Sequence, residues 1–149
     1  MFDLWDCDTN IIDNNYDISL DRAFYSAYKI DIEYDYVYVD FDDTLIIDDR
    51  VNEDLIRFLY QAVNSGKKII LLSKHRNNID ESLKKYRISR DLFDEIIILK
   101  MEDKKSDYIV GIPAIFIDDA FAERNEVTKN KGIPVFDVDM VEALIDWRK

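Results

Sequence analysis

Five short apolar runs alternate with helical patterns along this sequence and constrain its fold most. The runs cover residues 37–39, 67–72, 95–99, 114–117 and 132–136, and their apolar residues follow one another without polar alternation. Strands of this kind are buried on both faces, which is typical of a parallel sheet covered by helices. The sequence therefore predicts an α/β fold with three layers, in which helices cover both faces of a doubly wound parallel five-stranded sheet.

Helical patterns occupy the segments between these runs. The first has apolar residues at positions 55, 58, 59, 62 and 63, and Gly66 follows it as a typical helix end. Further helices are predicted at about 79–86, 105–110, 120–131 and 141–147. Each predicted strand is thus followed by a helix, which is the connection that parallel strands require.

Polar side chains directly follow three of the predicted strands. Asp40 and Asp42 follow the first, Ser73 follows the second, and Asp118 and Asp119 follow the fourth. The carboxyl ends of parallel strands lie at one edge of the sheet, where ligands bind. These groups meet if the first strand lies between the other two, and the sequence order alone does not give that arrangement.

Charge is distributed unevenly along the chain. The protein has 149 residues, which fits one domain, and a formal net charge of −12. Residues 1–35 contain nine acidic and two basic residues, so more than half of the excess negative charge lies there. Such a surface repels nucleic acid polymers and anionic membranes. We expect a catalytic domain at 36–149 and, at 1–35, an acidic extension with one helix around 20–28. This extension is either a packing arm or a cover for the site, as a lid or a dimer arm.

Cysteine content, the first residues and the length of the apolar runs bear on the location of the protein. Cys7 is the only cysteine, so no internal disulfide forms and a reducing compartment is favoured. The first residues are acidic where a signal peptide would be basic, and no apolar run approaches the roughly 18 residues of a membrane span. The sequence therefore predicts a cytoplasmic protein without a membrane partner.

Four segments together resemble the motifs of the haloacid dehalogenase (HAD) superfamily of phosphohydrolases. Residues 40–45, Asp-Phe-Asp-Asp-Thr-Leu, resemble its first motif, Asp-x-Asp-x-Thr. Residues 69–73 resemble the second, an apolar strand that closes in Ser or Thr, and residues 115–119 resemble the fourth, a strand that ends in paired aspartates. A lysine before the fourth strand would be the third. The resemblance covers residues 36–137 and implies a Rossmann-like sheet with strand order 5-4-1-2-3, which would bring the three strand ends together.

The resemblance implies that the first motif does the chemistry. Asp40 would be the nucleophile that forms an aspartyl-phosphate, and Asp42 would be the general acid and then the general base. An aspartate suits the attack because it is already anionic at pH 7. Neighbouring anions and partial burial would help Asp42 to hold a proton.

The resemblance also implies a Mg²⁺ site. Asp118 would bind the ion directly, with Asp119 as a further ligand or a partner of the ligands. The Asp40 carboxylate and the Asp42 backbone carbonyl would complete the set. We expect the four carboxylates of residues 40, 42, 118 and 119 to converge at one edge of the sheet. They would repel one another and a phosphate, and a hard divalent cation with oxygen ligands relieves this repulsion. The sequence has no His/Cys cluster that would favour Zn²⁺ instead. Asp119 has the alternative role of capping the following helix.

Three further residues are assigned to the phosphate side of the site. The Ser73 hydroxyl would hold a phosphate oxygen, and Lys74 lies beside it near the presumed mouth. Thr44 would mainly order the loop after Asp42. We expect Lys74, His75 and Arg76 to form a solvent-facing loop cluster.

Three residues are candidates for the lysine of the third motif: Lys100, Lys104 and Lys105. Lys105 is preferred because the family lysine starts a helix with an apolar residue one turn on, and Ile109 fits that position. Its role would be to screen the charges of the nucleophile and the phosphate.

The segments between the motifs are short. Many members of the family carry a cap domain, but residues 45–67 leave room for a flap and one helix, and residues 73–105 for one helix and one strand. A capless member with an open site is therefore predicted. A second copy, a partner protein or residues 1–35 would then be able to cover it.

These assignments predict Mg²⁺-dependent hydrolysis of a phosphomonoester, on a phosphorylated small molecule or a phosphoprotein. Two alternatives stay open: a phosphotransferase or phosphomutase, and a non-catalytic interaction or regulatory module with the same fold. A receiver domain is disfavoured, because the third strand is followed by Lys100 rather than by an aspartate.

Overall fold

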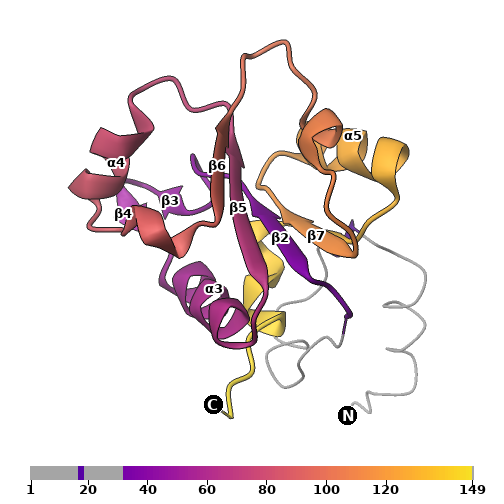
Figure 1. The fold of residues 1–149 in the computed structure, drawn as a ribbon, viewed down its shortest axis with the longest axis horizontal. Helices are drawn as coiled ribbons and strands as arrows, with labels where there is room; N and C mark the ends of the chain where they lie inside the picture. Colours follow the sequence, from indigo (N-terminus) through magenta and orange to yellow (C-terminus); the bar gives the residue numbers. More distant parts are fainter. Residues whose placement is uncertain (1–16, 19–31, 149) are drawn as a thin grey trace.

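A parallel sheet forms the centre of the protein, which is described by a computed structural model over residues 17–18 and 32–148. Five strands, β2 (Tyr36–Val39), β5 (Lys68–Ser73), β6 (Glu95–Ile98), β7 (Ala114–Ile117) and β8 (Val135–Phe136), lie in the order β8-β7-β2-β5-β6. All neighbours pair in parallel (Figure 1). This is the order 5-4-1-2-3 in chain numbering, so the predicted five-stranded sheet is confirmed.

A sixth strand extends this sheet at the β8 edge. Strand β1 (Asp17–Ile18) pairs in parallel with β8, through Asp17 with Val135 and Ile18 with Phe136. The sequence did not predict this strand, because two residues are too few to show a periodic pattern. The helix predicted around 20–28 lies outside the described residues.

The two faces of the sheet carry separate apolar clusters, as the alternation of side chains along a strand requires. Val37 and Val39 of β2 belong to the cluster that packs against α3 (Glu53–Asn64), α4 (Ile79–Lys85) and the 3₁₀ helix η3 (Val138–Ala143). Tyr38 belongs to the other cluster, which includes Val127 of α5 (Phe121–Lys131). A second 3₁₀ helix, η2 (Lys105–Tyr108), packs beside α5 on that face. Burial of each large apolar side chain in these clusters contributes about 1.5–3 kcal/mol.

Local signals fix both ends of α3. Asn52 is its N-cap, and the Asn52 side-chain oxygen accepts a hydrogen bond from the Leu55 backbone N–H at 3.2 Å. The helix ends at the Ser65 C-cap, and Gly66 follows with φ of 79°, a left-handed conformation that glycine adopts without steric cost. The predicted helix end at Gly66 is therefore confirmed.

The last predicted helix differs from the structure. Instead of an α-helix at 141–147, the 3₁₀ helix η3 begins at Val138, after Asp137 accepts a hydrogen bond from the Val138 N–H at 2.6 Å. The backbone N–H and C=O of Asp146 both bond to the Gln61 side chain, each at 2.8 Å. Because these two groups are engaged with α3, they do not continue a helix.

Short elements fill the segments between the strands that carry the motifs. The antiparallel pair β3 (Ile46–Ile47) and β4 (Arg50–Val51) and helix α3 lie between β2 and β5. Helix α4, the 3₁₀ helix η1 (Arg90–Leu92) and β6 lie between β5 and η2. Within residues 32–148 neither segment holds a separate domain. None of the helices in the described part of the chain is long and apolar enough to span a bilayer.

Candidate active site

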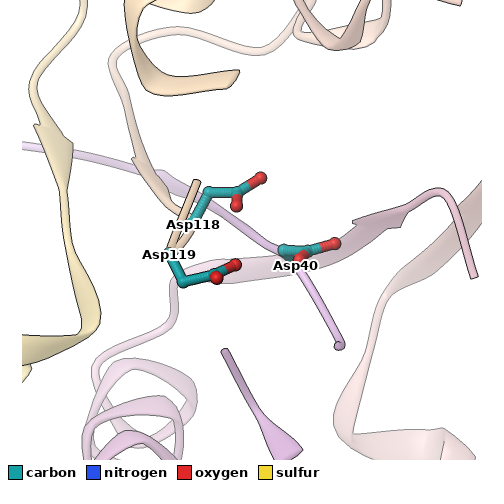
Figure 2. Close-up of side chains that lie close together, drawn as sticks. All are labelled: Asp40, Asp118 and Asp119. Carbon is teal, nitrogen blue, oxygen red and sulfur yellow. The ribbon is translucent and has the colours of Figure 1, made fainter. Parts of the chain in front are cut away.

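Three aspartates meet at the carboxyl end of β2 and β7. These strands pair through Val39 and Ile117, so the next residues, Asp40 and Asp118, emerge side by side from the sheet. Asp119 follows, and one carboxylate oxygen of each aspartate lies within 4.8 Å of the others (Figure 2). Asp40 and Asp118 are buried, while Asp119 is partly exposed. The expected meeting of residues from two separate motifs therefore occurs.

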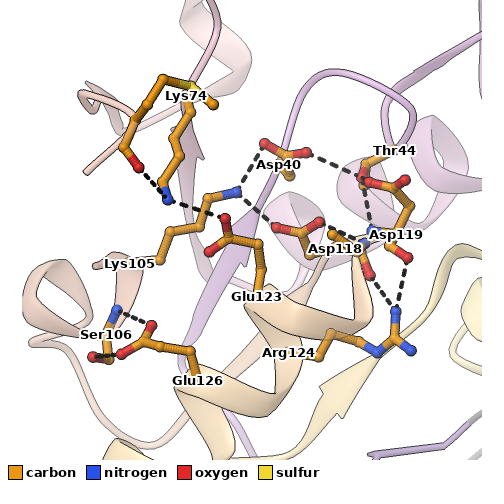
Figure 3. Close-up of polar contacts among 12 residues, drawn as sticks. Asp40, Thr44, Lys74, Lys105, Ser106, Asp118, Asp119, Glu123, Arg124 and Glu126 are labelled. Carbon is orange, nitrogen blue, oxygen red and sulfur yellow. Dashed lines mark hydrogen bonds and ion pairs between the residues drawn. The ribbon is translucent and has the colours of Figure 1, made fainter. Parts of the chain in front are cut away.

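Lys105 is the lysine that reaches this cluster. Its ammonium donates to Asp40 Oδ1 at 3.0 Å and to Asp118 Oδ2 at 2.7 Å, and only 2% of the residue is exposed (Figure 3). Lys104, the second candidate, is the exposed N-cap residue of η2. The geometry thus selects Lys105 over its neighbour.

The backbone beside Lys105 is anchored to α5. The Glu126 carboxylate accepts hydrogen bonds from both the Ser106 backbone N–H, at 3.2 Å, and the Ser106 hydroxyl. Asn130 donates to the same carboxylate at 2.7 Å. These contacts hold η2 against α5 and so fix the position from which Lys105 extends.

The charges in this cluster do not balance. Three carboxylates face one ammonium, which leaves two negative charges uncompensated when all three carboxylates are ionised. Burial, together with the charge of Asp40, raises the pKa of Asp118 to about 7, although Lys105 opposes the rise. Burial alone would lower the pKa of Lys105, but the charges of Asp40 and Asp118 outweigh it and the pKa is raised. Lys105 is therefore held in its charged form, and the surplus charge falls on the aspartates.

Thr44 joins the two ends of the acidic cluster. Its hydroxyl accepts a hydrogen bond from the Asp119 N–H at 3.1 Å, and it lies 3.4 Å from Asp40 Oδ2 and 3.3 Å from Asp119 Oδ1. A hydroxyl has one proton to donate, so Thr44 serves only one of these carboxylates at a time. The residue is fully buried, which agrees with the expected role in ordering the loop. No contact in the structure tests its assignment to the phosphate.

The start of α5 is tied to the same cluster. Asp118 Oδ1 accepts from the N–H of Ala120, the N-cap residue of α5, at 2.9 Å. Among residues 17–18 and 32–148 no side chain caps the helix, so the alternative role of Asp119 as its cap is wrong. Arg124 donates to the backbone oxygens of Asp118 and Asp119, at 3.1 and 3.0 Å. Arg124 thereby fixes the backbone of both aspartates and leaves the Asp119 carboxylate directed toward the cluster.

Ser73 has a buried hydroxyl without a hydrogen-bond partner. The residue ends β5 and is 1% exposed, and its Oγ makes no hydrogen bond among the described residues. An orphaned buried hydroxyl is uncommon, and one explanation is a ligand that completes it. This is the position assigned to a phosphate oxygen, and that assignment stays a prediction.

Lys74 does not face solvent as expected, because two contacts hold its side chain, which is only 17% exposed. Its ammonium lies 3.1 Å from Glu123 Oε2 and 3.1 Å from the backbone oxygen of Met101 (Figure 3). The side chain therefore connects the loop after β5 to the first turn of α5. Its role in binding substrate stays a prediction.

Asp42 departs from the expected convergence of four carboxylates. Its carboxylate is not a member of the cluster of three, and its side chain is 55% exposed. Instead, Asp42 Oδ2 lies 2.8 Å from His75 Nδ1. The expected metal contact of Asp42 was through its backbone carbonyl, and the structure does not test it.

His75 is placed differently from the expectation of a solvent-facing cluster. Its side chain is 6% exposed, and its Nε2 lies 2.8 Å from Ser82 Oγ on α4. No local pattern predicts this contact, because Asp42, His75 and Ser82 come from three different segments. Arg76, in contrast, is exposed as expected.

Comparison with solved structures identifies the fold. The chain superposes on the N-terminal part of protein BF1531 from Bacteroides fragilis, described as containing a phosphatase domain complexed with Mg, with a TM-score of 0.57 and 18% identity over 78% of this chain and 38% of that one. It shares the fold of a phosphatase domain. An uncharacterized protein from Corynebacterium glutamicum matches with a TM-score of 0.52 and 14% identity over 69% of this chain and 83% of that one. No protein-family model matches the sequence, and the search of curated proteins gives no significant match.

The donor set suits a hard divalent cation. Asp40, Asp118 and Asp119 offer only carboxylate oxygens, which Mg²⁺ prefers, and within the described residues no His or Cys belongs to the cluster. The two uncompensated negative charges match the charge of such an ion. The acidic cluster therefore fits a Mg²⁺ site in both chemistry and charge.

Proposed function

We propose that this protein is a Mg²⁺-dependent phosphatase of the HAD type that hydrolyses phosphomonoesters through an aspartyl-phosphate on Asp40. The observation that carries the proposal is the cluster of Asp40, Asp118 and Asp119 with Lys105 in contact with two of them. A purely structural cluster of three partly buried carboxylates with one cation would be costly, because buried charges are stable only when they are compensated. A bound divalent cation would compensate the surplus negative charge and so account for the arrangement.

The contacts of Asp40 support its proposed role as the nucleophile. Its Oδ1 is held by Lys105, while within the described part of the chain Oδ2 has only the long 3.4 Å contact with Thr44. Lys105 would screen the negative charge of Asp40 as a phosphate approaches. This screening lowers the activation barrier for attack of the carboxylate on the anionic phosphate group. When bound, a divalent cation would supply further charge neutralisation and orient the phosphate.

The reaction then has two steps. In the first, an Asp40 oxygen bonds to phosphorus, the bond from phosphorus to the leaving oxygen breaks, and Asp42 gives its proton to that oxygen. In the second, Asp42 takes a proton from water as the water oxygen bonds to phosphorus. The bond from phosphorus to Asp40 breaks, and phosphate leaves. The exposure of the Asp42 side chain is consistent with contact to both substrate and water.

The substrate would reach this site without passing a cap. Only the β3–β4 pair and α3 separate β2 from β5, and the acid Asp42 is itself exposed. An open site admits a phosphorylated small molecule or a phosphoprotein side chain. The net charge of −12 disfavours nucleic acid polymers as substrates.

Phosphatase turnover with matched isosteric variants tests the proposal. We expect the purified protein to hydrolyse an aryl phosphate with Mg²⁺, and we expect Asp40→Asn or chelation to reduce the rate by at least about a thousandfold. Asp48→Asn, the same change at an exposed position of the β3–β4 turn, serves as the control and should retain turnover. Turnover that survives in Asp40→Asn would exclude Asp40 as the nucleophile. Binding of a phosphate analogue without turnover on a broad substrate panel would instead favour a non-catalytic module.

A further inference from the structure

His75 is the one histidine of the sequence, and it sits between the proposed acid/base and helix α4. Nδ1 lies 2.8 Å from Asp42 Oδ2, and Nε2 lies 2.8 Å from Ser82 Oγ. The Phe41 ring packs against the imidazole edge, with 4.9 Å between centroids and 67° between planes. Both ring nitrogens and one edge of the ring are therefore engaged.

The partners define which ring nitrogen carries a proton. An ionised carboxylate only accepts hydrogen bonds, so the nitrogen that faces Asp42 has to donate. In the neutral imidazole this leaves Nε2 as an acceptor, and the Ser82 hydroxyl can donate to it. The contact with Asp42 thus favours the tautomer that carries its proton on Nδ1, and the Ser82 hydroxyl is compatible with it.

The side chain of Asp42 is much more exposed, and so freer to rotate, than that of His75. Asp42 is 55% exposed on its side chain, and it precedes Asp43, whose φ of 58° places the backbone in a tight left-handed turn. The His75 side chain is 6% exposed and is held by the contacts above. An exposed carboxylate that turns freely would spend little time in a reactive orientation, whereas a hydrogen bond from a fixed donor restricts it.

We propose that His75 is a positioning residue, which holds one oxygen of the Asp42 carboxylate and leaves the other directed toward the leaving group or water. This inference rests on the proposed function for its catalytic consequence, but the contact itself does not. Nδ1–H occupies Oδ2, so Oδ1 is the oxygen that carries or receives the proton. Ser82 supports the arrangement by holding the far side of the ring.

The single histidine makes the contact directly measurable. With ¹⁵N-labelled protein purified without a polyhistidine tag, the imidazole spectrum contains only His75 signals from the chain. We expect a proton on Nδ1 in the wild type at a mildly alkaline pH. In Asp42→Ala, which removes the acceptor, we expect the proton to shift toward Nε2. A wild-type ring protonated on Nε2 alone, or a spectrum unchanged by Asp42→Ala, would overturn the proposal.

Two substitutions of His75 separate the contact with Asp42 from that with Ser82. The Asn side-chain amide lies where Nδ1 lies and can donate to Asp42, whereas the Gln amide reaches the place of Nε2, beside Ser82. We compare kcat/KM, which reports the steps up to the phosphoenzyme, for an alkyl phosphate and for an aryl phosphate with an acidic phenol. Only the alkyl leaving group depends strongly on protonation by Asp42.

We expect His75→Gln to lower kcat/KM for the alkyl phosphate about 10- to 100-fold, and that for the aryl phosphate less than about threefold. His75→Asn should stay within about threefold of the wild type on both substrates. Lys84→Ala, an exposed change on the helix that carries Ser82, controls for substitution as such. Equal losses on both substrates, or equal losses in His75→Gln and His75→Asn, would contradict a positioning role.

Failure of this inference is distinguishable from failure of the proposed function. A wild-type protein with the Nδ1–H signature and no turnover on any phosphate ester contradicts the phosphatase and leaves the His75–Asp42 contact established. Normal turnover with a ring that does not respond to Asp42→Ala retains the phosphatase and rejects the positioning role. Thermal melting of each variant identifies any that fails to fold, and Ser82→Ala, which retains the imidazole, then replaces it in the kinetic comparison.

Discussion

Replacing Lys105 by Met tests the electrostatic account of the site most directly. The substitution keeps most of the apolar stem and removes the ammonium, which contacts Asp40 and Asp118 and lies 5.6 Å from the centre of the Phe116 ring. Loss of one partner from a buried ion pair costs about 3–5 kcal/mol of unfolding free energy. For a chain of this length such a loss lowers Tm by about 10 °C. We expect this loss in metal-free protein near pH 7.

The size of the loss depends on pH in a defined direction. Burial and Asp40 raise the pKa of Asp118 to about 7 in the wild type, and removal of Lys105 raises it further. Above pH 7 the wild-type folded state has released this proton, while the folded variant still binds it and loses it on unfolding. The stability difference therefore grows by up to about 1.4 kcal/mol per pH unit above 7. Urea unfolding at pH 7 and pH 8 without metal measures it.

Lys104→Met is the matched control. Lys104 is the exposed neighbour of Lys105 and the second candidate for the same role, so its loss should change stability by less than about 0.5 kcal/mol. Added Mg²⁺ should stabilise Lys105→Met more than the wild type, because it supplies positive charge to the same carboxylates. The account would be refuted if Lys105→Met were no less stable than Lys104→Met at pH 8 without metal.

Three further predictions follow from the same geometry. Mg²⁺ affinity, measured by calorimetry, should fall by up to about tenfold per pH unit below 7, because the ion then has to displace the proton that burial retains on Asp118; a flat profile from pH 5 to 7 would contradict this. Ser73→Ala should leave the urea midpoint nearly unchanged, because its hydroxyl has no partner to lose, and should raise KM about tenfold if that hydroxyl binds phosphate; an unchanged KM would remove Ser73 from the site. Glu126→Gln should cost about 1 kcal/mol and lower kcat, because it weakens the hold on Ser106 and so on the position of Lys105; full kcat would show that η2 needs no such support.

Much of the fold follows from the local pattern of the sequence. Consecutive apolar residues predict buried parallel strands, and the resemblance to a known family supplies the strand order that the structure confirms. Asp40 and Asp118 were expected to meet because each follows a strand directly, and strand register then leaves little freedom. The family resemblance favours Lys105 over Lys104, and in the structure Lys104 is the N-cap of η2 while Lys105 is its first residue and is buried.

Contacts between distant segments could not be predicted in the same way. His75 follows Ser73 by two residues and looks like part of a basic loop, yet its environment is set by Asp42 and Ser82 from other segments. The end of the chain is another case, since no α-helix forms at 141–147, where Gln61 and the Asp146 backbone exchange two hydrogen bonds although they are 85 residues apart in sequence. Neither contact leaves a periodic or compositional signal in its own segment.

Strand β1 also changes what the sheet offers to other molecules. An uncovered β8 would present free backbone N–H and C=O groups along its outer side, which is a template for lateral pairing with a second chain. Within the described residues, the outermost strand at this side is only two residues long. So short a strand gives an incoming strand few groups to pair with, and lateral growth of the sheet into an aggregate is disfavoured on this side.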